Sequence, residues 1–514
     1  MFVRGFSGAI VGIDAMMVSV EVNLAEEGGT GLTLVGLPDN AIKESQERIR
    51  AAFENSKLHM TAKKMVVNLA PADLRKEGSG FDLPIAVGIL GAMRQLFVEK
   101  FAQTMFLGEL SLDGSIRAIK GALPLAVAAR DRGLRYIVLP AENALEAAVV
   151  DGIEVLGVNT LREVVDWMNG LVEIEAVRYT LPTEGDESEM LFGEDFSDVK
   201  GQPQVKRALE IAAAGGHNVI MIGAPGSGKT MLSRRLPTIM PPLTMEESLE
   251  TTKIHSVAGK LGVKSGLMLQ RPFRAPHHLT SQVALIGGGQ SPQPGEVSLA
   301  HNGILFLDEL PEFGRNVLEV LRQPLEEKRI TISRARYTVE YPANFTLIAS
   351  MNPCPCGYYN HPDKECSCAP GSVHRYLGRI SGPLLDRIDL HIEVAALSVA
   401  EMSSTTEEES SEVVRARVVK AREIQEQRFR DIEGVHTNSM MNSRMLRVYA
   451  PLDSTARMML ERAMERMKLS ARAYDRIIKV ARTIADLEGK ESIEAAHISE
   501  SINYRGLDRE NWGR

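Results

Sequence analysis

The sequence predicts an α/β protein of three parts: an N-terminal α/β domain, a second domain built on a parallel sheet, and a C-terminal helical region. The first observation is length, because 514 residues suffice for about three domains. The second is the alternation of β-rich runs with helical patterns over residues 1–170 and, with glycine-rich segments, over residues 199–396. The third is the helical periodicity of residues 397–514, which show almost no strand signal.

Each part has its own expected elements, taken from β-rich runs and from apolar residues at helical spacing. In the first part, the expected strands are residues 18–22, 33–35, 65–68 and 136–139, and the expected helices are residues 41–54 and 81–95. In the second part, the expected strands are residues 218–222, 303–307 and 345–350. In the third part, the main expected helices are residues 415–430, 454–467 and 471–487.

Residues 171–198 are expected to form an acidic linker. From residue 183 to residue 198 the chain carries seven acidic residues and no basic one, with little apolar periodicity. Such a run repels itself and buries little apolar surface, so a solvated segment is predicted.

Composition excludes several classes of protein. With 59 basic and 67 acidic residues the formal net charge is -8, so any contact with nucleic acid must be local. The apolar stretch at residues 211–222 is shorter than the roughly 20 residues of a bilayer span. The first 15 residues have no long apolar core, so no signal peptide is predicted. We therefore expect a cytoplasmic protein without a membrane partner.

A glycine-rich motif lies between the expected strand at residues 218–222 and a helical pattern. It matches G-x-x-x-x-G-K-[ST], in which backbone N–H groups surround phosphates and the following helix adds positive potential. Lys229 is expected to reach the β and γ phosphates of ATP, and Thr230 to bind Mg²⁺. The predicted nucleotide-binding residues are Gly223, Ala224, Pro225, Gly226, Ser227, Gly228, Lys229 and Thr230.

Polar residues end two further expected strands. Asp308 and Glu309 follow an apolar run about 80 residues after the glycine motif. Asp308 is expected to position Mg²⁺ through its water shell, and Glu309 to polarise the attacking water. Asn352 follows the next strand, where its amide is placed to orient that water or the γ-phosphate.

Arg387 is a charge within an apolar run. One interpretation is a local ion pair with Asp386 or Asp389. The other is an arginine finger, which is presented to a neighbouring subunit's γ-phosphate and accelerates hydrolysis by roughly 10³ to 10⁵. In the second interpretation, the protein must oligomerise to hydrolyse ATP.

Several further motifs resemble the magnesium chelatase I-subunit group of AAA+ ATPases. They are Arg271-Pro-Phe-Arg-Ala-Pro-His-His278, Gly287-Gly-Gly289, Pro294-Gly-Glu296, Ala300-His-Asn-Gly303 and Ser381-Gly-Pro-Leu-Leu-Asp-Arg-Ile-Asp389. With the N-terminal domain, a cysteine segment and the overall length, essentially the whole chain is similar to the ComM/YifB branch of that group.

The resemblance implies an AAA+ domain with a C-terminal helical lid, assembled as a hexamer. It assigns Walker A to Lys229 and Thr230, Walker B to Asp308 and Glu309, sensor 1 to Asn352 and the finger to Arg387, with Arg379 as the alternative finger. Sensor 2 falls on Arg472, and two arginines on the same helical stretch, Arg476 and Arg482, compete for that role.

The resemblance also places an insert at about residues 271–296 and a β-hairpin at residues 330–339. In related ring helicases both elements face the central pore. Arg334 and Arg336 are therefore candidates for contact with DNA phosphates. The other interpretation is that both are solvated hairpin arginines.

All four cysteines lie in one stretch, as Cys354, Cys356, Cys366 and Cys368. Two C-x-C pairs supply four soft ligands, enough for a closed tetrahedral site that holds a structural Zn²⁺ ion. His361 in the intervening loop is an alternative ligand. No metal site is predicted at His277 and His278, because adjacent side chains diverge; a turn or pore-insert role is expected instead.

The segment at residues 71–87 and Gly108-Glu-Leu-Ser-Leu-Asp-Gly114 resemble the Lon protease domain, an α/β fold of the ribosomal S5 domain 2-like type. A Lon peptidase needs a Ser-Lys dyad. By this resemblance, the serine position falls on Gly80 and the lysine position on Leu123. An inactive domain serving assembly or nucleic-acid binding is expected, with a displaced Ser79/Lys120 pair as the alternative.

The residues predict an ATPase, and the resemblance implies what hydrolysis drives. That is a ring motor on branched or single-stranded DNA, a branch-migration helicase of recombination and natural transformation. The alternative is the ATPase component of a magnesium chelatase-type complex, which remodels a partner protein. The N-terminal domain and the cysteines favour the motor, because chelatase I subunits lack both. A Lon-type peptidase is disfavoured by the missing dyad.

Overall fold

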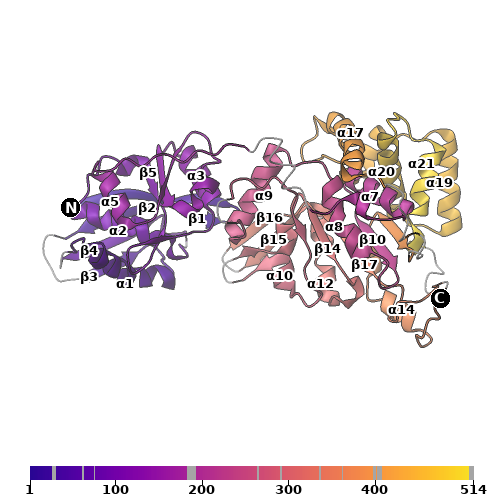
Figure 1. Cartoon of the computed structure of the whole chain (residues 1–514), viewed down its shortest axis with the longest axis horizontal. Helices are drawn as coiled ribbons and strands as arrows, with labels where there is room; N and C mark the ends of the chain where they lie inside the picture. The colour runs from indigo at the N-terminus through magenta and orange to yellow at the C-terminus, as the bar shows by residue number, and fades with distance from the viewer. Residues whose placement is uncertain are drawn as a thin grey trace.

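The structure is a computed structural model, and it describes the whole chain except residues 26–30, 61–62, 75, 182–192, 263–264, 290–291, 335–336, 362, 397–400, 402–407 and 509–514. Figure 1 shows an elongated molecule with the N-terminal domain at one end, the second domain in the middle and the C-terminal helices at the other end. Within the described residues, no helix combines the length and the apolarity that a bilayer span requires.

A seven-stranded mixed sheet forms the N-terminal domain. Its strands are β1 (Phe2–Val11), β2 (Asp14–Leu24), β3 (Gly31–Val35), β4 (Lys64–Ala70), β5 (Thr104–Phe106), β8 (Tyr136–Pro140) and β9 (Glu154–Val158), in the order β3-β4-β2-β1-β5-β8-β9. β2 is antiparallel to β1 and to β4, and the remaining pairs are parallel. The short strands β6 (Glu109–Leu110) and β7 (Ile116–Arg117) form a separate ribbon. All four strands predicted here lie within these limits and are confirmed.

Helices pack on this sheet. They are α1 (Asn40–Asn55), α2 (Asp82–Ala92), α3 (Ala122–Asp131), α4 (Ala141–Ala147) and α5 (Leu161–Met168). The predicted helix at residues 41–54 is confirmed as α1, and the one at residues 81–95 is α2, which ends three residues earlier. Every residue of α2 is buried, which agrees with its lack of a polar face; its one charged residue, Asp82, pairs with Arg48 at 2.7 Å.

A five-stranded parallel sheet forms the second domain. Its strands are β10 (Val219–Gly223), β11 (Phe273–Arg274), β14 (Ile304–Leu307), β17 (Thr346–Met351) and β18 (Leu390–Val394), in the order β11-β14-β17-β10-β18. β10, β14 and β17 are the three predicted strands, each within one residue of its predicted limits. Because β17 lies between β10 and β14 and all three are parallel, their carboxyl ends meet at one edge.

Helices and two small ribbons complete this domain. The helices are α7 (Pro203–Gly215), α8 (Lys229–Ile239), α9 (Met245–Ala258), α10 (Gln282–Ile286), α11 (Glu296–Leu299), α12 (Arg315–Glu319), α13 (Arg322–Glu327), α14 (Ser372–Leu377) and α15 (Gly382–Leu385). The ribbons pair β12 (Gly287–Gly288) with β13 (Gln293–Pro294), and β15 (Arg329–Arg334) with β16 (Tyr337–Pro342). The β15–β16 pair confirms the expected hairpin.

The C-terminal region is helical, as predicted. Its helices are α17 (Ser411–Phe429), α18 (Ser443–Tyr449), α19 (Ser454–Met467), α20 (Ala471–Leu487) and α21 (Ala495–Asn503). The predictions for α19 and α20 are confirmed to the residue, and α17 starts four residues before its predicted limit. Val414 of α17 and Val480 of α20 belong to the same hydrophobic core as Val219 of β10. The C-terminal helices are therefore packed onto the second domain rather than tethered beside it.

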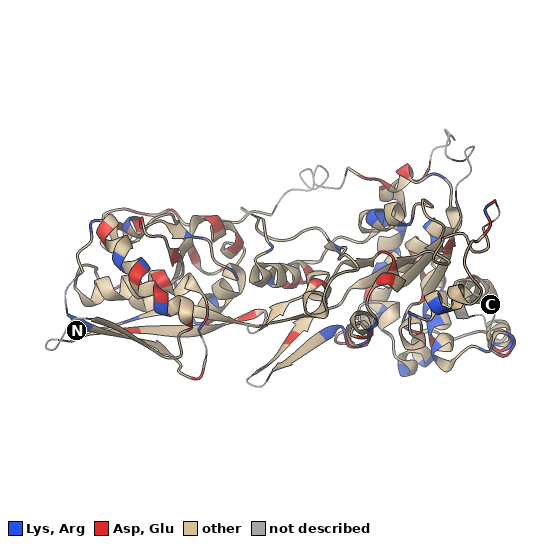
Figure 2. Ribbon diagram, turned by 90° about the horizontal axis from the view of Figure 1, so that it is seen from below, with Lys and Arg blue, Asp and Glu red and all other residues tan. Residues whose placement is uncertain are grey.

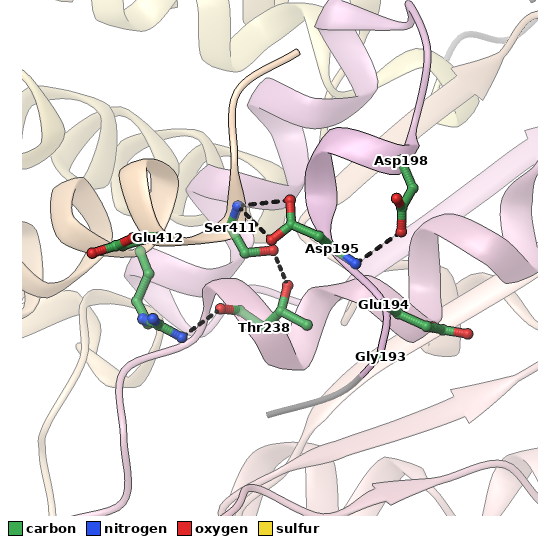
Figure 3. Close-up of a pocket in the computed structure, with 8 residues that line it drawn as sticks. Gly193, Glu194, Asp195, Asp198, Thr238, Ser411 and Glu412 are labelled. Atoms are coloured by element: carbon green, nitrogen blue, oxygen red, sulfur yellow. Dashed lines mark hydrogen bonds between the residues drawn. The ribbon is translucent and has the colours of Figure 1, made fainter. Parts of the chain in front are cut away.

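The two ends of the predicted acidic linker that the structure describes are packed. Asp195 accepts the backbone N–H of Ser411 at 3.2 Å from both carboxylate oxygens, and Phe196 is buried in the core of the second domain. Figure 3 shows Asp195 and Ser411 in the wall of a small pocket there. At the other end, Val177 donates its N–H to β9. The prediction of a solvated segment is therefore wrong at Phe196, whereas Asp198 is exposed and residues 182–192 lie outside the described part.

Among the described residues, the N-terminal domain contacts both the β15–β16 hairpin and helix α9 of the second domain. At the turn between β1 and β2, Ile13 packs against the core that contains the β15–β16 hairpin, and a methyl group built on Gly12 would lie 3.0 Å from Cγ1 of Val339. At α9, the backbone N–H of Gly121 donates to the carbonyl of Ser256 in that helix at 3.2 Å. The turn therefore lies directly against the hairpin.

A buried ion pair joins the sheet to the C-terminal helices. Asp389, next to β18, accepts Nη1 of Arg476 from α20 at 2.7 Å and the backbone N–H of Asn218 at 3.0 Å. His217 Nδ1 lies 3.5 Å from the same carboxylate. Burial opposes the charged form, but Arg476 and His217 outweigh it and hold the pKa of Asp389 well below its ordinary value.

Asp389→Asn should lower the free energy of unfolding by about 3 kcal/mol, because removing one charge of a buried pair leaves the other uncompensated. Urea unfolding at pH 7 measures the loss. The control is Asp386→Asn, whose partner Arg472 is exposed at 3.3 Å and which should cost less than about 1 kcal/mol.

The same contribution should depend on pH in one direction. Because the pKa of Asp389 is lower in the folded than in the unfolded protein, its stabilisation is complete above about pH 4 and is lost as the pH falls toward the folded value. The difference between wild type and Asp389→Asn should therefore shrink in acid; a difference that grows there would contradict the assignment.

Candidate nucleotide site and cysteine cluster

The glycine motif forms the loop between β10 and α8. Gly228 has φ +90°, a left-handed conformation that turns the chain into the helix. The Lys229 ammonium folds back on this loop and donates to the carbonyls of Gly223 at 2.8 Å and Ala224 at 2.9 Å. The pKa of Lys229 is lowered, because the effect of burial exceeds the opposing effect of the negative charges of Asp308 and Glu309.

Two hydroxyl side chains, one from α8 and one from β17, meet at the carboxylate of Asp308. Thr230, in the first turn of α8, donates its hydroxyl to Oδ2 of Asp308 at 2.9 Å. Ser350 of β17 donates to Oδ1 of Asp308. A hydroxyl beside a carboxylate supplies the hard oxygen ligands that Mg²⁺ prefers, so the donor set fits that ion. Ser350 was missed by sequence reasoning, although it is a buried hydroxyl at the end of an apolar run.

Asn352 and Glu309 lie at the same edge. Oδ1 of Asn352 is 3.3 Å from Nζ of Lys229, so the strand-terminal amide reaches the glycine loop. Glu309 follows β14 with φ +54°, and its half-exposed carboxylate lies 3.6 Å from Nδ1 of His278. His278 was assigned to a turn or insert, and nothing in the sequence indicates this contact across 31 residues.

Arg387 is not exposed for contact with a neighbouring subunit in this conformation. Its side chain is 6% exposed and pairs with Glu326 of α13 at 2.5 Å, and it donates to the carbonyl of Pro383 at 2.6 Å. An ion pair was one of the two interpretations, but Glu326 is the partner rather than Asp386 or Asp389. Arg379 is 53% exposed and pairs with Glu312 at 2.9 Å.

The side chains of the three candidates for sensor 2 differ in exposure and in the ion pairs that they form. Arg482 is buried and pairs with Asp486, and Arg476 is committed to Asp389. Arg472, at the start of α20, is 61% exposed and pairs only loosely with Asp386 at 3.3 Å. Arg472 is therefore the candidate whose side chain can move most easily.

The β15–β16 hairpin projects from the body of the second domain, as Figure 2 shows. Arg334 ends β15 and pairs through the backbone with Tyr337, which places it at the outer end of the hairpin. Arg336 lies outside the described residues.

The four cysteines converge after β17. All are free thiols, and their sulfur atoms lie within 4.8 Å of one another. The Sγ–Sγ separations are 3.3 Å for Cys354 and Cys356, 3.8 Å for Cys354 and Cys366, and 3.5 Å for Cys356 and Cys366. A tetrahedral Zn²⁺ with bonds of about 2.3 Å separates its sulfurs by about 3.8 Å, so the arrangement fits zinc.

The thiols of the cluster differ in acidity. The backbone N–H of Tyr358 lowers the pKa of Cys356 to about 6, whereas burial raises the pKa of Cys354 to about 12. His361, the alternative ligand, instead accepts the backbone N–H of Asp363 at Nδ1. Among the described residues, the group that converges is the four cysteines alone.

Comparisons with known proteins agree with this architecture. Family models match residues 20–143 (Subunit ChlI of Mg-chelatase), 195–402 (Magnesium chelatase, subunit ChlI) and 408–505 (Magnesium chelatase, subunit ChlI C-terminal). The chain is 44% identical to the competence protein ComM of Haemophilus influenzae over 510 residues, which cover 98% of this chain and 97% of that protein. This chain belongs to the ComM/YifB family of magnesium chelatase-like proteins.

Other relatives of the ComM/YifB chain differ in how much of it they match. The uncharacterized protein YifB of Escherichia coli is 43% identical over 502 residues, or 98% of this chain and 96% of that protein. The magnesium-chelatase 38 kDa subunit of Cereibacter sphaeroides is 25% identical over 174 residues, or 31% of this chain and 52% of that protein. Membership of this AAA+ group implies an ATPase that uses ATP and Mg²⁺ and assembles as an oligomer.

The displaced Ser79/Lys120 pair of this ComM/YifB chain is not formed. Ser79 donates its hydroxyl to the carboxylate of Glu109. The Lys120 side chain instead lies against Gly259 at the end of α9. Among the described residues, no hydrogen bond joins Ser79 to Lys120, so the structure does not assemble a serine activated by a lysine amine.

Purified protein should contain about one zinc ion per chain, and Cys366→Ser should lose it, because three thiolates hold the ion far more weakly than four. Elemental analysis after gel filtration measures the ratio. His361→Ala is the control and should keep its zinc. Loss of zinc from His361→Ala, with retention by Cys366→Ser, would identify the histidine as the ligand instead.

Proposed function

We propose that the protein is an ATP-driven ring motor on branched or single-stranded DNA, and that it acts as a branch-migration helicase in recombination and natural transformation. The observation that carries the ATPase half is the convergence of Lys229, Thr230 and Asp308 at the carboxyl edge of the parallel sheet. The DNA half is supported by near-full-length similarity to a protein named for competence.

The loop and its neighbours divide the work of hydrolysis. The Lys229 ammonium donates hydrogen bonds to the carbonyls of Gly223 and Ala224, and phosphate oxygens would replace these carbonyls as acceptors when ATP binds. Thr230 and Asp308 would hold Mg²⁺, whose charge neutralises the phosphates. Glu309 polarises the attacking water, and Asn352 orients it or the γ-phosphate.

In the proposed hexamer, Arg387 acts on the ATP of the adjoining subunit. Within one chain it is held by Glu326, whose side chain is half exposed and so lies at the surface. Contact with the neighbour must therefore replace this ion pair before Arg387 reaches a phosphate. Arg379 is the alternative finger, and Arg472 serves as sensor 2 by virtue of its exposure.

The projecting hairpin is the proposed DNA contact. With a net charge of -8, the chain cannot rely on general attraction, so a local basic element is needed. Arg334 and Arg336 on the hairpin supply it in this proposal, through phosphate contacts that carry no sequence information.

The alternative is an ATPase subunit of a magnesium chelatase-type complex. The Cereibacter sphaeroides relative favours it by name, but the similarity covers only 31% of this chain, whereas the relative named for competence covers 98% of it. The peptidase alternative is disfavoured, because Ser79 is bonded to a carboxylate rather than to a lysine.

A synthetic four-way DNA junction should stimulate ATP turnover several-fold, and the stimulation should fall as salt rises, because phosphate contacts are screened. Turnover is measured with and without the junction. Lys229→Ala should be inactive in both cases. Arg334→Ala with Arg336→Ala should retain basal turnover and lose the stimulation. Turnover that ignores DNA yet responds to added partner proteins would favour the chelatase alternative.

Mixing two inactive variants tests the finger. Arg387→Ala keeps its glycine loop and Lys229→Ala keeps its guanidinium, so a mixed ring contains some complete interfaces. An equal mixture should recover about a quarter of wild-type turnover, since half of the loops and half of the fingers are intact. Failure to recover any turnover would show that Arg387 acts within its own chain or not at all.

A further inference from the structure

The cysteine turn touches the glycine loop directly. Gly357 follows Cys356 in a turn closed by its own N–H, which donates to the carbonyl of Cys354 at 3.0 Å. Gly357 has φ +85°, and a methyl group built on it would lie 2.5 Å from Cδ and 2.7 Å from Cγ of Pro225. The main chain of the turn therefore packs against the Pro225 ring so closely that no side chain fits between them.

A second contact ties the same segment to the loop. Asn352 lies two residues before Cys354, and its side-chain oxygen is 3.3 Å from Nζ of Lys229. Residues 352–357 thus contact the glycine loop at both ends, with two of the four sulfurs between the contacts. Whatever fixes those sulfurs also fixes the two contacts.

The part of the loop that Gly357 supports is otherwise open. Pro225 is exposed, whereas Ser227 further along is buried, and its carbonyl accepts Nε2 of Gln202 at 3.1 Å. The buried end of the loop is therefore hydrogen-bonded to another part of the same domain. The exposed bend at Pro225 instead packs against the cysteine turn.

We propose that the cysteine cluster is a brace for the nucleotide loop: with zinc bound, Gly357 holds Pro225 in the shape that receives phosphates, and loss of zinc weakens ATP binding. This inference rests on the proposed nucleotide role of the loop. Gly357 and Pro225 are positioning residues, because they act through the loop and not on the phosphates. The proposal links metal content to nucleotide affinity by one contact.

The physical basis is the cost of selecting one loop conformation. A metal ion that is bound by four ligands restricts the chain between them, because the free energy of metal binding offsets the conformational entropy that the chain loses. If the loop without zinc adopts the binding shape only a tenth of the time, the apparent Kd rises about tenfold. The effect appears in affinity even when the rest of the domain stays folded.

The variant Pro225→Ala distinguishes an effect of zinc through the Gly357–Pro225 contact from a general loss of structure on zinc removal. The affinity of the full-length protein for a fluorescent, non-hydrolysable ATP analogue is measured before and after zinc is removed with a chelator, and again after Zn²⁺ alone is added back. Wild type should bind about tenfold more weakly without zinc, whereas the affinity of Pro225→Ala should change by less than about twofold. An equal loss in both proteins, or no loss in wild type, would overturn the proposal.

A second pair of variants leaves all four thiols in place. Gly357→Ala brings a methyl group against Pro225 and should weaken binding of the analogue about tenfold. Gly371→Ala is the matched control, because Gly371 has a similar φ of +75° and open space around a built methyl group. Equal binding by the two variants would overturn the contact as the cause.

These measurements use neither DNA nor turnover, so failure of DNA stimulation leaves their outcome untouched. If wild type with zinc does not bind the analogue at all, the proposed nucleotide role itself is wrong. Zinc dependence that disappears in Pro225→Ala supports the brace whatever the motor acts on.

Discussion

The parallel pairing of β17 with β10 on one side and β14 on the other is the constraint on which the site depends. It brings a loop, a carboxylate pair and an amide, which are separated by up to 123 residues along the chain, to one edge of the sheet. The Asp308 carboxylate then receives hydroxyls from Thr230 and Ser350, one from the helix after β10 and one from β17 itself. A slip in either pairing would move these donors apart, and the lysine would lose its partner at Asn352.

Much of this could be predicted from sequence, because the signals are contiguous. The glycine loop, the carboxylates after an apolar run and the clustered cysteines each lie within a short segment, and strand, loop and helix follow in chain order. The contacts that could not be predicted join segments whose spacing carries no pattern. His278 beside Glu309, Glu326 on Arg387 and Gly357 against Pro225 all depend on how the segments between them fold.

Composition was misleading where a few apolar residues outweighed many charges. The stretch around Phe196 is acidic, yet one buried ring and the hydrogen bond from the Ser411 backbone N–H to Asp195 attach it to the second domain. Arg387 is a charge in an apolar run, and its guanidinium is buried because it pairs with Glu326, whose own side chain is half exposed. In both cases the partner, rather than the residue type, decided the position.

The turn between β1 and β2 has a mechanical consequence. Because Ile13 packs into the core under the β15–β16 hairpin and Gly12 lies against Val339, any swing of the hairpin away from that turn uncovers apolar surface. Exposure of that surface to water is unfavourable, so the free energy of the molecule rises when the hairpin moves away. The N-terminal domain would thus stabilise the hairpin in the orientation that it has in this structure.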